Sequence, residues 1–225
     1  MKIEKISPKT IRQQVYDQLR RKIISAEILP GQVMTLQGLA TEFGVSMMPV
    51  REALWQLESE KVIVIDANKS ICVSALSARD MKEALEIRMM LESRAAEKAC
   101  NRITHDELAK LKQLLDGMEA SYDKPKRFML LNSQFHFTIY SCADSPMLLG
   151  IIDSLWARIG PYLNIGWAKA GDHSFTSNCH REMYEALVHK DKKRLKKWLC
   201  GDLREAAGAI IPNLENSISQ TKENI

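Results

Sequence analysis

Four polar residues in the second half of the chain have the types and the spacing of a metal site. Asn132 and His136 are four residues apart, so on a helix they lie one above the other on the same side. His180 and Asp202 belong to two later segments, where each falls in line with apolar residues. Imidazole nitrogens with a carboxylate suit Zn²⁺, Ni²⁺ or a similar divalent ion, whose binding would compensate for the cost of burying these groups.

The same residues also have a simpler structural interpretation. An inward histidine is often a hydrogen-bonded core residue, and an inward aspartate is often a salt-bridge partner. The spacing alone does not bring the four side chains to one point. Metal ligands and core residues that satisfy one another therefore remain two open alternatives.

Helical periodicity from residue 77 onward predicts the elements that position these side chains. Ser77 and Thr104 are suitable N-caps for two of the helices. The predicted helices span residues 78–100, 104–121, 126–142, 145–170, 173–189 and 191–211. Together they predict an all-α antiparallel bundle over residues 77–211, followed by a flexible tail at 212–225.

Residues 1–76 have a different organisation. Apolar residues recur at helical spacing on both sides of Gly44, which suits a left-handed helix end, and predict two short helices within residues 36–57. Ser46 could cap the second of them by accepting a hydrogen bond from its first-turn amides. The other predicted elements are a helix near residues 10–26 and strands at 62–65 and 71–73.

Three helices followed by a two-stranded β-hairpin predict a winged helix-turn-helix, a fold that binds double-stranded DNA. Its second helix would present its N-terminal face to the major groove. The residues expected there are Ser46, Met47, Met48 and Arg51. Because one such helix reads only one half-site, a homodimer on a palindromic operator is expected.

The composition is compatible with a mainly α protein of two domains. The chain has 225 residues, of which 45% are hydrophobic and 27% charged, enough for two modest cores. Its net charge of +4 is too small to prove a nucleic-acid partner. The five scattered cysteines, the lack of a signal peptide and the lack of a membrane-spanning apolar run lead us to expect a cytoplasmic protein without a membrane partner.

Residues 8 to 75 contain Leu-Pro-Gly at residues 29–31, GVSMMPVREALWQLESEKVI at residues 44–63 and the predicted hairpin after it. In these features they resemble the DNA-binding domain of GntR-type bacterial transcription regulators. The resemblance implies operator contacts by Ser46 and Arg51, and often by the residue at Gln37 on the preceding helix.

Two departures from the GntR pattern change what is expected at the DNA. Met47 stands where the family usually has arginine, which removes a guanine contact worth about 1 to 3 kcal/mol of discrimination. Met47 and Met48 could instead pack against thymine methyl groups. Glycines are also usual where this chain has Lys61 and, at the wing tip, Asn68 and Lys69, and we count Lys69 among the expected DNA contacts.

Residues 77 to 211 include the segments LNSQFHFTIY at residues 131–140 and HREMYEALVHKD at residues 180–191. Through these segments above all, they resemble the FCD-type ligand-binding domain of the FadR branch of GntR regulators. The resemblance implies a bundle of six or seven helices around a metal or small-acid pocket. In metal-binding members an aspartate stands at the position of Asn132 and a histidine at that of Asp202, so this site either holds a retuned set of ligands or binds an effector without an ion.

Arg88 lies on the apolar side of the predicted helix 78–100, four residues before Glu92. The two could form an ion pair within the core. The resemblance implies a second role, because an arginine at this place in FCD domains commonly faces the pocket. Its planar guanidinium suits the carboxylate of a small-molecule effector.

The sequence therefore predicts a non-enzymatic, homodimeric transcription regulator that binds an operator through its first domain and a small effector through its second. Two other functions stay open. The bundle could serve only to dimerise the protein, or it could be a metalloenzyme. The chain contains no HExxH motif, nucleophile elbow or glycine-rich phosphate loop that would favour an enzyme.

Overall fold

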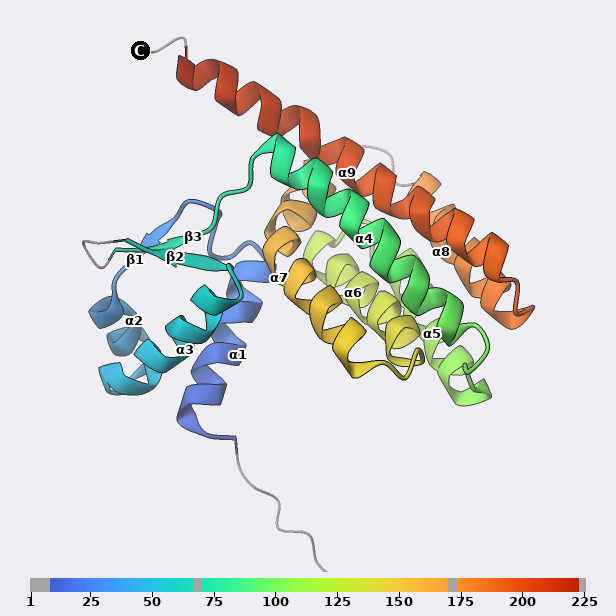
Figure 1. The fold of residues 1–225 in the computed structure, drawn as a ribbon, viewed down its shortest axis with the longest axis horizontal. Helices are drawn as coiled ribbons and strands as arrows, with labels where there is room; N and C mark the ends of the chain where they lie inside the picture. Colours follow the sequence, from blue (N-terminus) through green and yellow to red (C-terminus); the bar gives the residue numbers. More distant parts are fainter. Residues whose placement is uncertain (1–8, 67–69, 170–173, 223–225) are drawn as a thin grey trace, which may run out of the picture. The chain divides into compact units, whose positions relative to one another are not determined.

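A computed structural model describes residues 9–66, 70–169 and 174–222 (Figure 1). The chain divides into two compact units, Met1–Ala75 and Leu76–Ile225. As predicted, the protein is mainly α, with a small antiparallel sheet in the first unit and a helical bundle in the second. Among the described helices, none combines the length and the apolar character needed to cross a membrane.

The first unit is built on the helices α1 (Ile11–Ile24), α2 (Leu36–Phe43) and α3 (Met47–Ser59). Gly44 ends α2 with a φ of 65°, the left-handed conformation that the sequence predicts. The predicted side-chain cap at Ser46 is wrong, because its hydroxyl makes no cap hydrogen bond. Pro49 occupies the third position of α3 and has no N–H to donate to that hydroxyl.

The sheet of the first unit has three strands where the sequence predicts two. Strands β1 (Val33–Met34), β2 (Ile63–Ile65) and β3 (Ile71–Val73) lie in the antiparallel order β1-β3-β2. With two residues, β1 is too short to give an alternating pattern. The tip of the hairpin, with the predicted contact Lys69, lies outside the described residues.

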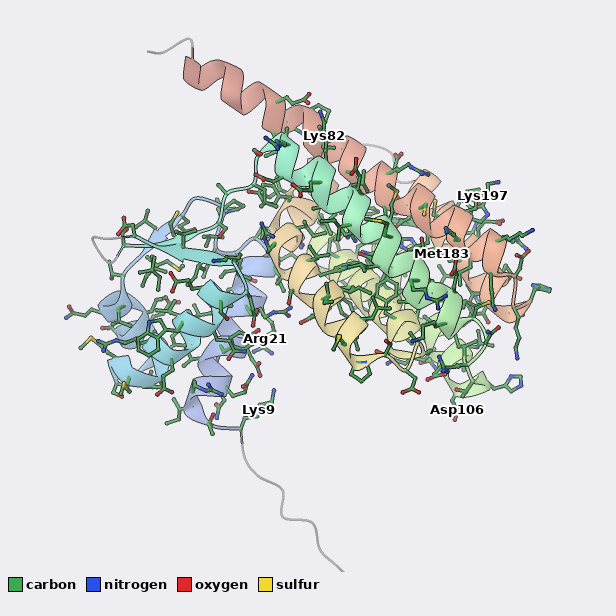
Figure 2. All side chains as sticks on the ribbon, in the orientation of Figure 1. Lys9, Arg21, Lys82, Asp106, Met183 and Lys197 are labelled. Atoms are coloured by element: carbon green, nitrogen blue, oxygen red, sulfur yellow. The ribbon has the colours of Figure 1, made fainter. Side chains whose placement is uncertain are left out.

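The second unit begins with two helices that are capped as the sequence predicts. Ser77 and Thr104 each form a capping box, with Asp80 and Glu107 respectively. The helix α9 packs along both α4 and α8, and Met183 of α8 lies in the core while Lys82 and Lys197 project from the surface (Figures 1 and 2). The helices are α4 (Ala78–Ala99), α5 (His105–Glu119), α6 (Pro125–Ser141), α7 (Pro146–Lys169), α8 (Ser174–Val188) and α9 (Lys192–Lys222).

The predicted helix end at residue 211 is wrong, because α9 continues through Pro212 to Lys222. A proline inside a helix removes one backbone hydrogen bond, which is why an end was expected there. Tertiary contacts compensate for it. Leu214 packs against the bundle core, and Glu215 forms an ion pair with Lys82 at 2.8 Å.

Lys61 has a φ of 59°, the conformation that Gly44 adopts without cost. A residue other than glycine in this left-handed region destabilises the folded state by about 1 to 2 kcal/mol. Replacing it by glycine removes this cost, but the net stabilisation is smaller because glycine also gives the unfolded chain more conformational freedom. We expect Lys61→Gly to stabilise the first unit by about 0.5 to 1 kcal/mol and Gly44→Ala to destabilise it by about 1 kcal/mol. Hydrogen exchange of the α3 amides measures both changes, and equal signs for the two variants would contradict the argument.

Candidate functional site

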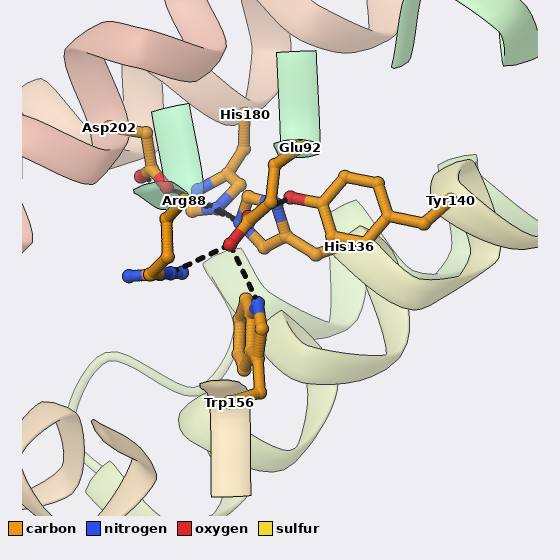
Figure 3. Close-up of polar contacts among 7 residues, drawn as sticks. All are labelled: Arg88, Glu92, His136, Tyr140, Trp156, His180 and Asp202. Atoms are coloured by element: carbon orange, nitrogen blue, oxygen red, sulfur yellow. Dashed lines mark hydrogen bonds and ion pairs between the residues drawn. The ribbon is translucent and has the colours of Figure 1, made fainter. Parts of the chain in front are cut away.

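Three of the predicted metal ligands meet in the core of the second unit. The Nε2 atom of His136, on α6, lies 3.3 Å from Oδ2 of Asp202, on α9, and 3.3 Å from Nε2 of His180, on α8 (Figure 3). The Nε2 atom of His180 is also 3.6 Å from Oδ1 of Asp202. All three residues are buried, and one donor atom from each lies within 4.8 Å of the others. The arrangement offers two imidazole nitrogens and a carboxylate to one small cation.

The fourth predicted ligand, Asn132, lines a cavity beside this cluster. It lies one turn before His136 on α6 and is buried. The cavity has a volume of about 70 Å³, and its walls also include Asp202, Thr176 and Glu205. Since one water takes about 30 Å³, this space holds a few waters or a small polar group next to the carboxylate.

Burial and charge set the protonation of the cluster. Burial lowers the pKa of His180 to about 4, so this imidazole is neutral near pH 7. Burial alone would raise the pKa of Asp202, but the neighbouring histidines and the charge of Arg88 outweigh it and lower that pKa. A neutral imidazole and an ionised carboxylate are the forms that bind a metal ion.

Glu92 is the centre of a polar network next to the cluster. Its side chain is fully buried and accepts hydrogen bonds from Arg88 Nε at 2.7 Å and from Trp156 Nε1 at 3.0 Å, both at Oε1 (Figure 3). The Tyr140 hydroxyl donates a short hydrogen bond to Oε2. Tyr140 in turn lies 3.0 Å from Nδ1 of His136, which joins the network to the cluster.

Arg88 forms the predicted ion pair with Glu92 and also lies over the ring of Trp156, 4.8 Å from its centroid. The bond to Glu92 uses Nε and so leaves Nη1 and Nη2 unengaged by that carboxylate. Sequence reasoning missed the role of Tyr140. The signal was its position four residues after His136, which puts both on one face of α6.

Five of the six predicted DNA-contacting residues lie on the surface of the first unit, and the sixth, Lys69, is outside the described residues. Gln37, Ser46 and Met47 line one groove between α2 and α3. Met48 and Arg51 are exposed on α3, in the first turns of the helix. These five residues therefore form one accessible surface around the N-terminus of α3.

Trp55 is an exposed residue of α3 that the sequence did not single out. Its side chain is 57% exposed, which is unusual for a tryptophan. It follows Met47 and Arg51 at intervals of four residues, so the three share one face of α3. The spacing was the signal that could have found it.

A winged helix-turn-helix with an exposed second helix, followed by a helical bundle with a buried polar site, defines the class of two-domain transcription regulators. The model of the bacterial regulatory proteins of the gntR family matches residues 11–73, and the model of the FCD domain matches residues 83–204. The chain therefore belongs to the GntR family and carries an FCD domain. It is a DNA-binding transcription regulator, and the family consists of regulators rather than enzymes.

Similar proteins include the HTH-type transcriptional regulator McbR of Escherichia coli K12, which is 30% identical over 187 residues covering 80% of this chain and 83% of McbR. The gluconate operon transcriptional repressor of Bacillus licheniformis is 32% identical over 201 residues, or 86% of this chain and 82% of the repressor. The solved structure of E. coli McbR/YncC has a TM-score of 0.82 at 26% identity and covers 94% of this chain and 100% of its own.

The depressed pKa of His180 predicts a stability that depends on pH. Between pH 6.5 and about 4 the unfolded chain binds a proton at His180 that the folded chain does not, so the free energy of unfolding falls as the pH falls through this window. The loss at pH 4.5 relative to pH 7 should be about 2 to 3 kcal/mol in the metal-free protein. Urea unfolding at both pH values measures it.

His180→Gln should remove this part of the pH dependence. The exposed His189 provides the matched control, since His189→Gln should leave the difference between the two pH values unchanged. An undiminished pH dependence in His180→Gln would assign the effect to another group.

Proposed function

We propose that the FCD domain of this regulator binds one divalent metal ion, zinc or nickel, through His136, His180 and Asp202. The observation that carries the proposal is the convergence of their donor atoms within 4.8 Å in the core. Asn132 lines the space beside them and adds an amide oxygen as a weaker ligand. A bound ion would supply a Lewis acid for an oxygen of the effector, held at the site by these residues.

The charges of the site support a cation. Asp202 and Glu92 are buried carboxylates, and Arg88 is the buried guanidinium that accompanies them. Two negative groups against one positive group leave a net negative charge in a medium of low dielectric constant, which a bound cation would neutralise. Buried charges in proteins are generally paired with an opposite charge or coordinate a metal ion.

We further propose that the effector is a small carboxylic acid bound in the cavity that Asn132 and Asp202 line. A carboxylate would complete the coordination of the ion. Arg88 is not among the described residues that line this cavity, so its guanidinium would attract the carboxylate only through its charge. The relative from B. licheniformis is named as the repressor of a gluconate operon, and gluconate is itself a carboxylate. The effector would change DNA affinity by stabilising one arrangement of the paired DNA-binding domains.

We also propose that the regulator is a cytoplasmic homodimer of the FadR branch that binds a palindromic operator. The helices α4 and α7 pack together and expose Met90, Met147 and Ile151, with Met147 82% exposed. A second copy of the chain would cover these apolar side chains. It would also supply the second recognition helix that a palindrome requires.

A bundle that only dimerises is the second candidate. His180 and His136 are within 3.3 Å of each other and both lie close to Asp202, so the three can satisfy one another without an ion. Metal binding separates the two candidates directly.

Protein purified without chelator or affinity-tag nickel should contain about one equivalent of metal per chain. The double variant His136→Ala, His180→Ala should lose it, whereas His105→Ala, His189→Ala should keep it because those histidines are exposed. Zinc at about 100 times its Kd should stabilise the wild-type protein by about 2.7 kcal/mol and leave the first variant unchanged. Metal analysis and thermal unfolding test this, and a wild-type protein without metal and without a zinc response would favour the dimerisation module.

The DNA surface predicts recognition of thymine methyl groups by Met47 and Met48. On an operator selected from random duplexes, replacing a contacted thymine by uracil removes one methyl group and should weaken binding about 4-fold. Arg51→Ala should weaken binding by about 10-fold or more but should still bind the uracil duplex more weakly than the thymine duplex. Met47→Ala should bind both duplexes equally when the replaced thymine is the one that Met47 contacts. Titrations at fixed salt measure each affinity. Equal binding of the thymine and uracil duplexes would contradict the methyl contact.

A further inference from the structure

We propose that Tyr140 and Glu92 are positioning residues that keep the proton of His136 on Nδ1, so that its Nε2 lone pair is available to the metal site. The inference rests on the proposed metal-binding function and extends it to two residues outside the ligand set. It follows from the hydrogen-bond capacities of the groups in the network around Glu92.

The direction of the network is set at Glu92. Arg88 Nε and Trp156 Nε1 have only protons to offer, so Oε1 of Glu92 accepts from both, at 2.7 and 3.0 Å. A carboxylate paired with a guanidinium offers lone pairs at its other oxygen as well. Oε2 therefore accepts the proton of the Tyr140 hydroxyl.

The direction of the bond from Tyr140 to Glu92 determines the direction of the hydrogen bond between Tyr140 and His136. A phenol has one proton, and Tyr140 has given it to Glu92, so only its oxygen lone pairs face Nδ1 of His136 at 3.0 Å. Burial and the charge of Glu92 raise the pKa of Tyr140, which keeps the hydroxyl protonated. Nδ1 of His136 must then be the donor of this hydrogen bond.

The proton on Nδ1 decides what His136 presents to the cluster. In a neutral ring Nε2 then carries the lone pair, 3.3 Å from Asp202 Oδ2 and 3.3 Å from His180 Nε2. If both ring nitrogens carried protons, Nε2–H would donate to Asp202. A metal ion binding at Nε2 would then displace only the Nε2 proton and leave the proton on Nδ1. In both the neutral and the doubly protonated ring, the hydrogen bond at Nδ1 leaves Nε2 as the nitrogen that binds the ion. Outer hydrogen-bond partners of metal-binding histidines usually have this role.

Two variants separate this role from simple satisfaction of buried groups. Tyr140→Phe removes the acceptor of Nδ1–H and should weaken zinc binding about 10- to 100-fold. In Glu92→Gln the side-chain oxygen still accepts from Arg88 and Trp156, so its NH₂ group faces Tyr140. The hydroxyl must then donate to His136, which reverses the tautomer and puts the proton on Nε2.

The experiment is ¹⁵N NMR of His136 in the metal-free protein at about pH 8, where the two tautomers have distinct nitrogen shifts. We expect Nδ1–H in the wild type and Nε2–H in Glu92→Gln. The matched control is Tyr162→Phe, because Tyr162 is also buried and its hydroxyl accepts a hydrogen bond, from the Leu76 amide at 2.6 Å. This control should change neither the tautomer nor the zinc affinity.

Each result has a defined meaning. An Nε2–H tautomer in the wild type, or an unchanged tautomer in Glu92→Gln, would overturn the positioning role. So would a wild-type zinc affinity in Tyr140→Phe. If the wild type binds no zinc, the proposed metal function fails, but the tautomer still tests the direction of the network, so the two failures are distinguishable.

Discussion

The buried carboxylate of Glu92 is the group on which the bundle core depends. Its complete burial would be costly without donors at both oxygens. Those donors come from three helices: Arg88 of its own helix α4, Tyr140 of α6 and Trp156 of α7. One polar group thus fixes the relative positions of three helices, where apolar contacts alone would tolerate small shifts.

The same requirement organises the neighbouring cluster. Arg88 is held by Glu92 but also acts on Asp202, whose pKa it helps to lower. His136 connects the two parts, with Nδ1 toward Tyr140 and Nε2 toward Asp202. The buried polar residues therefore form one continuous system rather than a ligand site with separate supports, and a change at one end alters the charge or the hydrogen bonding at the other.

What the sequence predicted correctly depends on local rules. Gly44, Ser77 and Thr104 mark helix ends through their own conformation and side chains, so a few neighbouring residues suffice. The Ser46 cap was wrong because a second local rule, the missing N–H of Pro49, overrode the first. The course of α9 past Pro212 could not be predicted, since it depends on tertiary contacts.

The site likewise combines a feature that local spacing predicts with features that depend on tertiary packing. The spacing of Asn132 and His136 gave one face of α6, but whether His180 of α8 and Asp202 of α9 reach that face depends on the packing of the whole bundle. The directions of the hydrogen bonds around Glu92 could not be predicted from the sequence, because they depend on which atoms of four side chains meet.

The helix α7 relates this network to the start of the second unit. Trp156 binds Glu92 near the cluster, and six residues later Tyr162 accepts the hydrogen bond of the Leu76 amide. Six residues of helix span about 9 Å, so both bonds lie within two turns of α7, one on each side of Pro161. A displacement of α7 as a whole would therefore disturb both bonds together. Through Trp156 and Tyr162, α7 is hydrogen-bonded both to the buried network and to the backbone at the first residue of the bundle.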